Sequence, residues 1–191
     1  MLATIRSGAL IGIEPYQIDV EVHLSRGMMV FAVVGLPAGA VCEARTRVKS
    51  ALQNCGYGFP QRRVIVNLAP ANIKKEGTRF DLPIALGILM ADGRIPAEAL
   101  DGTLVVGELS LDGRLRPVRG VLPLAARAIG MGARRILVPR GNASEAAVVQ
   151  ALEVYTADHL AELVEALTSE DALSREPPTP PNPGGREYGV D

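Results

Sequence analysis

The clearest pattern along the chain is an alternation of apolar and polar residues from residue 17 to residue 24. Successive side chains of a strand point to opposite faces, so this alternation predicts a strand with one buried face. A strand over residues 3–13 is predicted before it, with a turn at Glu14-Pro15. Residues 28–34 form a more continuous apolar run, and we expect a third strand there, near the centre of the sheet. The buried face of the alternating strand is predicted to carry Ile18, Val20, Val22 and Leu24.

Two segments have helical periodicity instead. Apolar residues recur every three to four positions between residues 41 and 54, which predicts an amphipathic helix stopped by the glycines that follow. Residues 81–91 are apolar on every side, so a helix here is expected in the middle of the fold. Asp81 is predicted to be its N-cap, and Pro83 fits its first turn. A strand over residues 61–70 and a charged loop over residues 71–79 are predicted between the two helices.

The second half of the chain alternates short strands and helices. Asp112-Gly113 predicts a tight hairpin within residues 103–118. Beyond it we expect a helix over residues 121–132 and then a strand–helix–strand–helix series that ends in a helix capped by Asp158. Such a series indicates parallel strands joined by crossovers. The predicted fold is therefore α/β, with a mixed sheet and helices, over residues 1–167. Residues 168–191 are rich in proline and are predicted to be a flexible linker or tail.

Composition narrows the classes of protein that the sequence can represent. The formal net charge is only −1, so a basic nucleic-acid-binding character could come only from local patches. Cys42 and Cys55 both fit apolar positions on the first helix, and we interpret them as reduced core residues. The first residues lack the apolar run of a signal peptide, and no segment reaches the length of a membrane span. These features predict a cytoplasmic protein without membrane contact.

No catalytic centre is evident. A Walker A loop needs Gly-Lys before Ser or Thr, and no lysine in this chain follows a glycine. The glycine-rich segment 35–40 is interpreted as a structural turn between a strand and a helix. Lys49 and Ser50 are adjacent on a helix, where neighbouring side chains do not face each other. His23 and His159 lie far apart and, with the two cysteines, lack the spacing of metal ligands. We therefore predict no cofactor or metal site in this chain.

Local groups of basic residues are the best candidates for function. The simplest interpretation is a solvated surface, and the alternatives are contact with DNA phosphates or with an acidic partner. We favour the loop that precedes the buried helix, because a helix N-terminus adds to the attraction for phosphate. The candidates are Arg45 and Lys49 on the first helix, Arg62 and Arg63 at the start of the next strand, and Lys74, Lys75 and Arg79 in the loop.

Residues 35–89 resemble the ComM/YifB family of magnesium-chelatase-like AAA+ proteins over the run GLPAGAVCEARTRVKSALQNCGYGFPQRRVIVNLAPANIKKEGTRFDLPIALGIL, and the similarity extends from residue 1 to about residue 167. The resemblance implies that the chain is the N-terminal domain of a larger ATPase and stops before the motor module. ATP and Mg²⁺ are then expected only in that missing module. It further implies assembly into a hexameric ring through the full-length protein, with weak DNA contact by the isolated domain, in DNA processing during natural transformation.

The N-terminal domain of this family in turn resembles the proteolytic domain of Lon and the C-terminal domain of RadA, which implies a Lon-protease-like fold. Matching residues 81–86 to the serine-bearing motif of Lon places Ile84 at the serine position. Matching residues 107–123 places Leu122 at the lysine position. An apolar pair can neither attack a carbonyl nor relay a proton. The implied role is a non-catalytic accessory domain for DNA contact or ring assembly. The alternatives are a module that recruits a protein partner, and a residual hydrolase that uses other residues.

Overall fold

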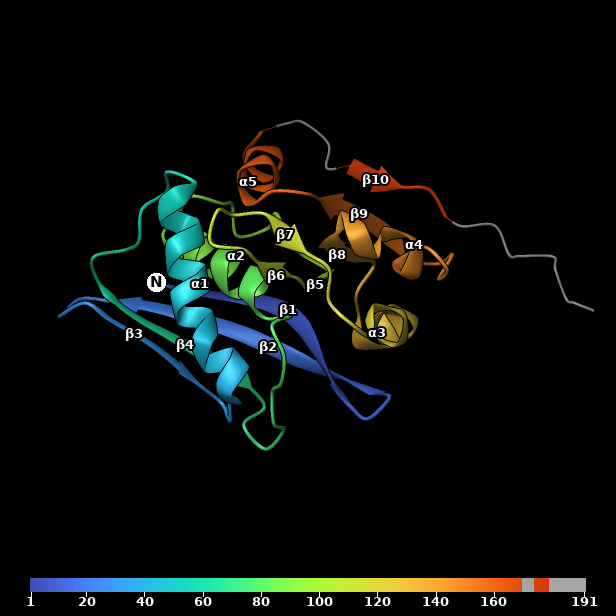
Figure 1. The fold of residues 1–191 in the computed structure, drawn as a ribbon, viewed down its shortest axis with the longest axis horizontal. Coiled ribbons are helices and arrows are strands. Elements are labelled where there is room, and N and C mark those ends of the chain that lie inside the picture. The colour runs from blue at the N-terminus through green and yellow to red at the C-terminus, as the bar shows by residue number, and fades with distance from the viewer. Residues whose placement is uncertain (170–173, 179–191) are drawn as a thin grey trace, which may run out of the picture.

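A computed structural model describes residues 1–169 and 174–178 of the chain. Within these residues, an eight-stranded mixed sheet has the order β10-β9-β8-β5-β1-β2-β4-β3, with helices packed against it (Figure 1). The predicted α/β class is thus confirmed. The first half comprises β1 (Leu2–Ile11), β2 (Glu14–Ser25), β3 (Val30–Val34), α1 (Gly39–Asn54), β4 (Arg63–Ala69) and α2 (Asp81–Ala91).

The second half contributes the parallel part of the sheet and a small separate hairpin. Strands β5, β8 and β9 are parallel to one another, and β5 pairs with β1 in the same direction. The elements are β5 (Thr103–Val105), β6 (Glu108–Leu109), β7 (Leu115–Arg116), α3 (Val121–Ala128), η1 (Ile129–Met131), β8 (Arg135–Pro139), η2 (Arg140–Asn142), α4 (Ala143–Ala146), β9 (Glu153–Ala157), α5 (Leu160–Thr168) and β10 (Ser174–Glu176).

The antiparallel part of the sheet is built on β2. It pairs with β1 along the full length of that strand, from Leu2 opposite His23 to Ile11 opposite Glu14, and with β4 on its other side. The turn between β1 and β2 therefore lies at residues 12–13, two residues earlier than predicted. The predicted inward face of β2 is confirmed, since all four of its alternating apolar residues are at most 3% exposed.

Strand β3 corrects one prediction. Its apolar sequence predicts a central strand, but β3 lies at the edge of the sheet, parallel to β4. Helix α1 packs beside it, and its side chains remain half-buried or exposed. Gly35 ends the strand at a positive φ of 95°, where a Cβ would lie 2.3 Å from the carbonyl oxygen of Leu68. Only glycine permits this close approach of two backbones.

Two apolar cores lie on the two faces of the sheet. Helices α1, α2 and α5 cover the larger core, and α3 and α4 cover the smaller one. Strand β8 contributes to both cores, because Leu137 faces the larger one while Ile136 and Val138 face the smaller. Cys42 and Cys55 are free thiols at half-buried positions on α1 and just beyond its end, rather than fully inside the core.

Helix α2 is buried along its whole length, as predicted. It crosses β1 and β2 so closely that a Cβ on Gly87 would lie 2.6 Å from Cγ2 of Val22. The predicted N-cap is wrong, because Asp81 is the first helical residue and Phe80 occupies the cap position without a side-chain hydrogen bond. The Asp81 carboxylate has a different role, which is described below.

The remaining differences from the sequence analysis concern the second half. The hairpin at Asp112-Gly113 is confirmed as β6 and β7, but β5 belongs to the main sheet. The residue that caps α5 is His159 and not Asp158, since Nδ1 of His159 accepts a hydrogen bond of 3.2 Å from the amide of Ala161. Helix α4 has only four residues.

The segment predicted to be a flexible tail begins differently from the prediction. Residues 174–176 form β10, which pairs antiparallel with β9 at the sheet edge opposite β3. The rest of the predicted tail, residues 170–173 and 179–191, lies outside the described residues. The boundary at residue 167 remains a prediction. No helix in the described part of the chain is long and apolar enough to cross a membrane.

Candidate nucleic-acid interface

The two positions that the Lon resemblance matches to a catalytic pair both carry aliphatic side chains in the fold. Ile84 is fully buried in the first turns of α2, and Leu122 is exposed near the start of α3. Neither side chain can act as a nucleophile or a base. Within residues 1–169 and 174–178, no group of three or more His, Cys, Asp or Glu side chains is placed to hold a metal ion.

Lys75, one of the candidate phosphate ligands, lies inside the protein. Its side chain is 0% exposed and its ammonium donates a hydrogen bond to the carbonyl oxygen of Pro70. Its backbone also joins two loops, because its amide donates to Leu36 O (3.2 Å) and its carbonyl accepts from the Ala38 amide (2.9 Å). Burial lowers the pKa of this lysine. The prediction that Lys75 is an accessible phosphate ligand is therefore wrong: its side chain is buried and stabilises the loop through its hydrogen bond to Pro70.

The other cations of this loop are also poorly available. Lys74 is exposed but its ammonium lies 2.7 Å from a carboxylate oxygen of Glu76, which is equally exposed. Arg79 is partly buried, and burial lowers its pKa. Its Nη1 atom is inaccessible and has no hydrogen-bond partner in the described part of the chain. The exposed surface of the loop over residues 74–79 therefore presents little free positive charge, and Arg79 lies partly inside the protein.

The opposite end of β4 differs from this loop. Arg63 begins the strand, opposite Ser25 of β2 and Val30 of β3, and Arg62 precedes it. Arg26 follows Ser25, so all three arginines meet at one corner of the sheet. Each of them is exposed. Arg26 was not among the predicted site residues, although its place directly after the alternating strand of residues 17–24 was a usable signal.

Helix α1 brings two more predicted cations to the same corner. Nη1 of Arg45 donates to the carbonyl oxygen of Phe31 in β3 at 3.4 Å. The ammonium of Lys49 lies 5.8 Å from the ring centroid of Phe59, whose ring is 5.0 Å from that of Phe31. We call this group the basic corner: Arg26, Arg45, Lys49, Arg62 and Arg63. No ion pair joins any of its members to a carboxylate among the described residues.

A further arginine of α1 serves the structure. Arg47 binds Asp81 with two hydrogen bonds, from Nε to Oδ2 at 2.6 Å and from Nη2 to Oδ1 at 3.0 Å. Asp81 also accepts from the amide of Leu109 at 3.3 Å. Burial raises the pKa of Asp81, and the guanidinium opposes that rise by stabilising the carboxylate. The hydrogen bond with Asp81 also raises the pKa of Arg47. This pair fixes α1 to the start of α2.

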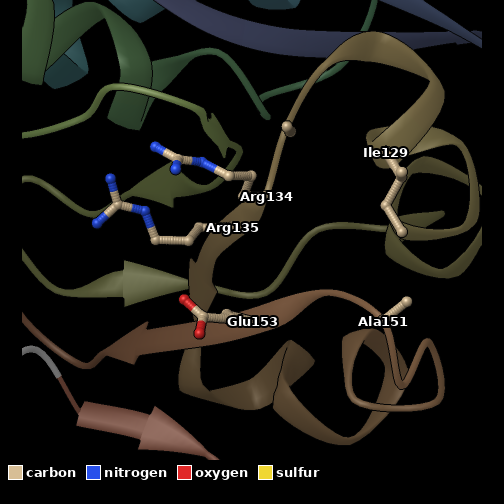
Figure 2. Close-up of a pocket in the computed structure, with 6 residues that line it drawn as sticks. Ile129, Arg134, Arg135, Ala151 and Glu153 are labelled. Carbon is tan, nitrogen blue, oxygen red and sulfur yellow. The ribbon is translucent and has the colours of Figure 1, made fainter.

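The surface depression shown in Figure 2 is a weaker candidate. It has a volume of about 630 Å³ and lies beside the first residues of β8 and β9, where Arg134 and Arg135 project on the same side. Arg135 donates to the carbonyl oxygen of Asp101 at 2.6 Å. Glu153, which also lines the depression, forms an ion pair with Arg175 of β10 at 3.1 Å. The acidic side chain reduces the local positive potential, in contrast to the basic corner.

Comparison with known proteins places this fold in a class. Residues 20–142 match the family described as subunit ChlI of Mg-chelatase. The chain is 42% identical over 178 residues to the protein YifB of Escherichia coli strain K12, covering 93% of this chain and 35% of that protein. It is 43% identical over 172 residues to the competence protein ComM of Haemophilus influenzae, covering 90% of this chain and 34% of that protein.

These matches define a magnesium-chelatase-like protein of the AAA+ class. Within that class, the chain belongs to the ComM/YifB family. It spans about a third of the length of these relatives. A partial likeness to Lon protease 2 of Bacillus subtilis, 34% identity over 74 residues, covers 38% of this chain and 13% of that protein. The likeness to Lon thus extends over a part of the domain only.

Proposed function

We propose that this chain is a non-catalytic accessory domain of a ComM-like AAA+ protein, and that it contacts DNA phosphates through the basic corner. ATP and Mg²⁺ would serve a motor module elsewhere in such a protein, and the domain would add grip on DNA to a ring of subunits. The competence role stated in the name of the Haemophilus relative is consistent with work on DNA. Isolated domains would bind weakly, because a ring multiplies small contacts.

One observation carries the proposal: five cations from α1, the start of β4 and the turn after β2 meet, and none of them has a carboxylate partner within the part of the chain that the structure describes. Phosphate contacts need cations that are free to exchange their counterions for the nucleic-acid backbone. Four of the five are arginines, whose planar guanidinium can bind two phosphate oxygens at once. Because the protein has a net charge of only −1, unpaired cations gathered at one corner give that surface a locally positive potential.

A second candidate function is ring assembly through the edge strand β3, and the side chains around it favour this idea. Residues 27–42 contain no charged residue, and Met28 is 85% exposed. An exposed, uncharged edge strand is a template for pairing with another chain. The opposite edge strand, β10, carries the ion pair of Arg175 with Glu153 and has no comparable apolar surface.

The decisive experiment is a salt titration of binding to a duplex oligonucleotide, followed by fluorescence anisotropy. For Arg62→Ala/Arg63→Ala, the slope of log affinity against log salt should become shallower by about 2, since about 0.9 is expected for each phosphate contact in duplex DNA. A matched control is Arg127→Ala/Arg134→Ala, which removes two exposed cations far from the corner and should leave the slope near that of the wild type.

Two results would contradict DNA contact by the basic corner. One is an equal loss of slope in both double variants, which would indicate general charge attraction. The other is a lack of binding by the wild-type chain at low salt. If the wild type instead self-associates in sedimentation experiments, and Val34→Lys abolishes that association, the assembly function through β3 is the better description.

A further inference from the structure

A second cavity lies far from the basic corner, at the other end of β4. It has a volume of about 290 Å³ and opens between the loop that precedes α2 and the loop that precedes α3. Its lining includes Thr78, Arg79, Glu108, Val118 and Arg119. One wall of the cavity ends next to residues 81–86, and the other belongs to residues 107–123, the two segments in which the Lon resemblance places Ile84 and Leu122 at the catalytic positions. The cavity therefore borders both of those segments.

The walls of this cavity are held by the fold and are not a gap between loose loops. The carbonyl of Arg79 accepts a hydrogen bond of 3.0 Å from the amide of Gly107. On the other wall, the buried Asn142 binds both backbone groups of Val118, accepting from its amide at 2.9 Å and donating to its carbonyl at 2.8 Å. A cavity with such fixed walls is preorganised, so a ligand would not need to order it on binding.

The charges in the cavity are unbalanced. Arg79 lines the cavity and forms no ion pair in the described part of the chain. Arg119 is exposed and likewise forms no ion pair within that part. Glu108 offsets part of this charge but forms no ion pair with either arginine among the described residues, and its Oε2 accepts a hydrogen bond from the hydroxyl of Thr78. A partly buried guanidinium without an acceptor calls for a partner that the protein itself does not supply.

The neighbouring pair makes the contrast plain. Arg47 of α1 contacts the first residue of α2, where the fold supplies a buried carboxylate, Asp81, with two hydrogen bonds. Among the described residues no carboxylate pairs with Arg79, although burial lowers its pKa and so disfavours its charged form. Arg47 of α1 thus has a carboxylate partner, whereas Arg79, in the loop before α2, lines the cavity and has no such partner among the described residues.

We propose that this cavity binds a small oxyanion, a phosphate or carboxylate group, between the guanidinium groups of Arg79 and Arg119. The two arginines and Glu108 give the lining a formal charge of +1, which suits a single anionic group. The volume is at the lower end of ligand pockets, of which about 300 Å³ is a typical minimum, so it admits a group or a small molecule. This site is independent of the DNA proposal, because it shares no residue with the basic corner.

The test is a thermal-shift titration of the 191-residue chain at constant ionic strength, with sodium chloride replaced stepwise by sodium phosphate or by sodium acetate. A bound anion stabilises the folded state, so Tm should rise and then saturate. Arg79→Gln should abolish the rise, and Arg119→Gln should shift its midpoint to at least about tenfold higher anion, the effect of losing one charge-assisted hydrogen bond. Arg127→Gln, on the outer face of α3, should respond as the wild type does.

A second variant guards against a trivial loss of folding. Arg79→Met removes the unpaired cation, so its Tm in chloride alone should equal or exceed that of the wild type while its response to anion is lost. A larger rise with phosphate than with acetate assigns the site to a phosphate group, and the reverse assigns it to a carboxylate. The absence of a saturable rise with either anion, or an undiminished rise in Arg79→Gln, would overturn the proposal. The salt dependence of DNA binding should be unchanged in Arg79→Gln, which separates the two proposals.

Discussion

The two ends of β4 are alike in sequence and different in structure. At the start of the strand, Arg62 and Arg63 stand exposed beside Arg26 without carboxylate partners among the described residues. Beyond its end, Lys75 is fully buried and Lys74 is paired with Glu76. Both ends count as basic clusters when charges are read from the sequence. The comparison teaches that a cation is available to a partner only if the fold neither buries it nor pairs it with a carboxylate.

The largest expected effect concerns Arg47, the cation of α1 that forms an ion pair with the buried Asp81. Asp81→Ala removes the two hydrogen bonds between this guanidinium and its buried carboxylate and should lower the free energy of unfolding by about 3 kcal/mol, the lower part of the range for breaking a buried pair because Arg47 is 18% exposed. Urea denaturation measures this. Glu43→Ala is the matched control, because it removes the exposed partner of the same arginine and should cost only a few tenths of a kcal/mol. Equal costs for both variants would show that the pair with Asp81 is not structural.

The next effect tests the buried end of the comparison. Lys75→Ala removes a fully buried side chain and the donor to the Pro70 carbonyl, and we expect a loss of about 2 kcal/mol in the free energy of unfolding. Lys75→Met keeps the aliphatic volume and removes the desolvated charge, so it should retain more stability than the alanine variant. The salt slope of DNA binding should stay unchanged in both variants. A fully stable Lys75→Ala protein with a shallower slope would instead mean that the loop exposes this lysine.

The smallest effect is expected at Lys74. Because Glu76 is its partner and both side chains are exposed, Lys74→Ala should leave the urea midpoint unchanged. Its DNA-binding slope should fall by less than about 1, the value for one full phosphate contact. Glu76→Gln, which frees the lysine, should steepen the slope by a similar amount. A fall for Lys74→Ala as large as that of Arg62→Ala would remove the distinction between the two ends of the strand.

The hydrophobic periodicity predicted the regular elements, in which buried and exposed positions repeat along the sequence. The alternation around Val20 identified the strand and its inward face, and the uniform apolar sequence of α2 identified a buried helix. The position of β3 could not be predicted in this way, because an apolar run gives burial but not the number of strands on either side. The apolar residues of β3 pack beside α1, and β3 lies at the edge of the sheet. The local sequence pattern shows neither the neighbouring helix nor the position in the sheet.

Long-range polar partners limited the prediction of the site. The cap assigned to Asp81 rested on its place before a helix, whereas its actual partner, Arg47, lies 34 residues earlier in the chain. Four of the seven predicted basic residues do come together, since α1 and the start of β4 are joined by a short connection. Arg26 joins them through strand pairing, which only the register of β2 and β4 fixes.

Helix α2 contacts the sheet through Gly87, whose side chain is a single hydrogen atom. A methyl group on Gly87 would collide with Val22, so the spacing between the helical layer and the sheet is set by the smallest residue. Glycine disfavours a helix interior, by about 0.5–1 kcal/mol relative to alanine. Helix propensity alone would favour replacing Gly87 by alanine. Because the added methyl group would collide with Val22 of β2, a descendant of this sequence can change Gly87 only together with Val22.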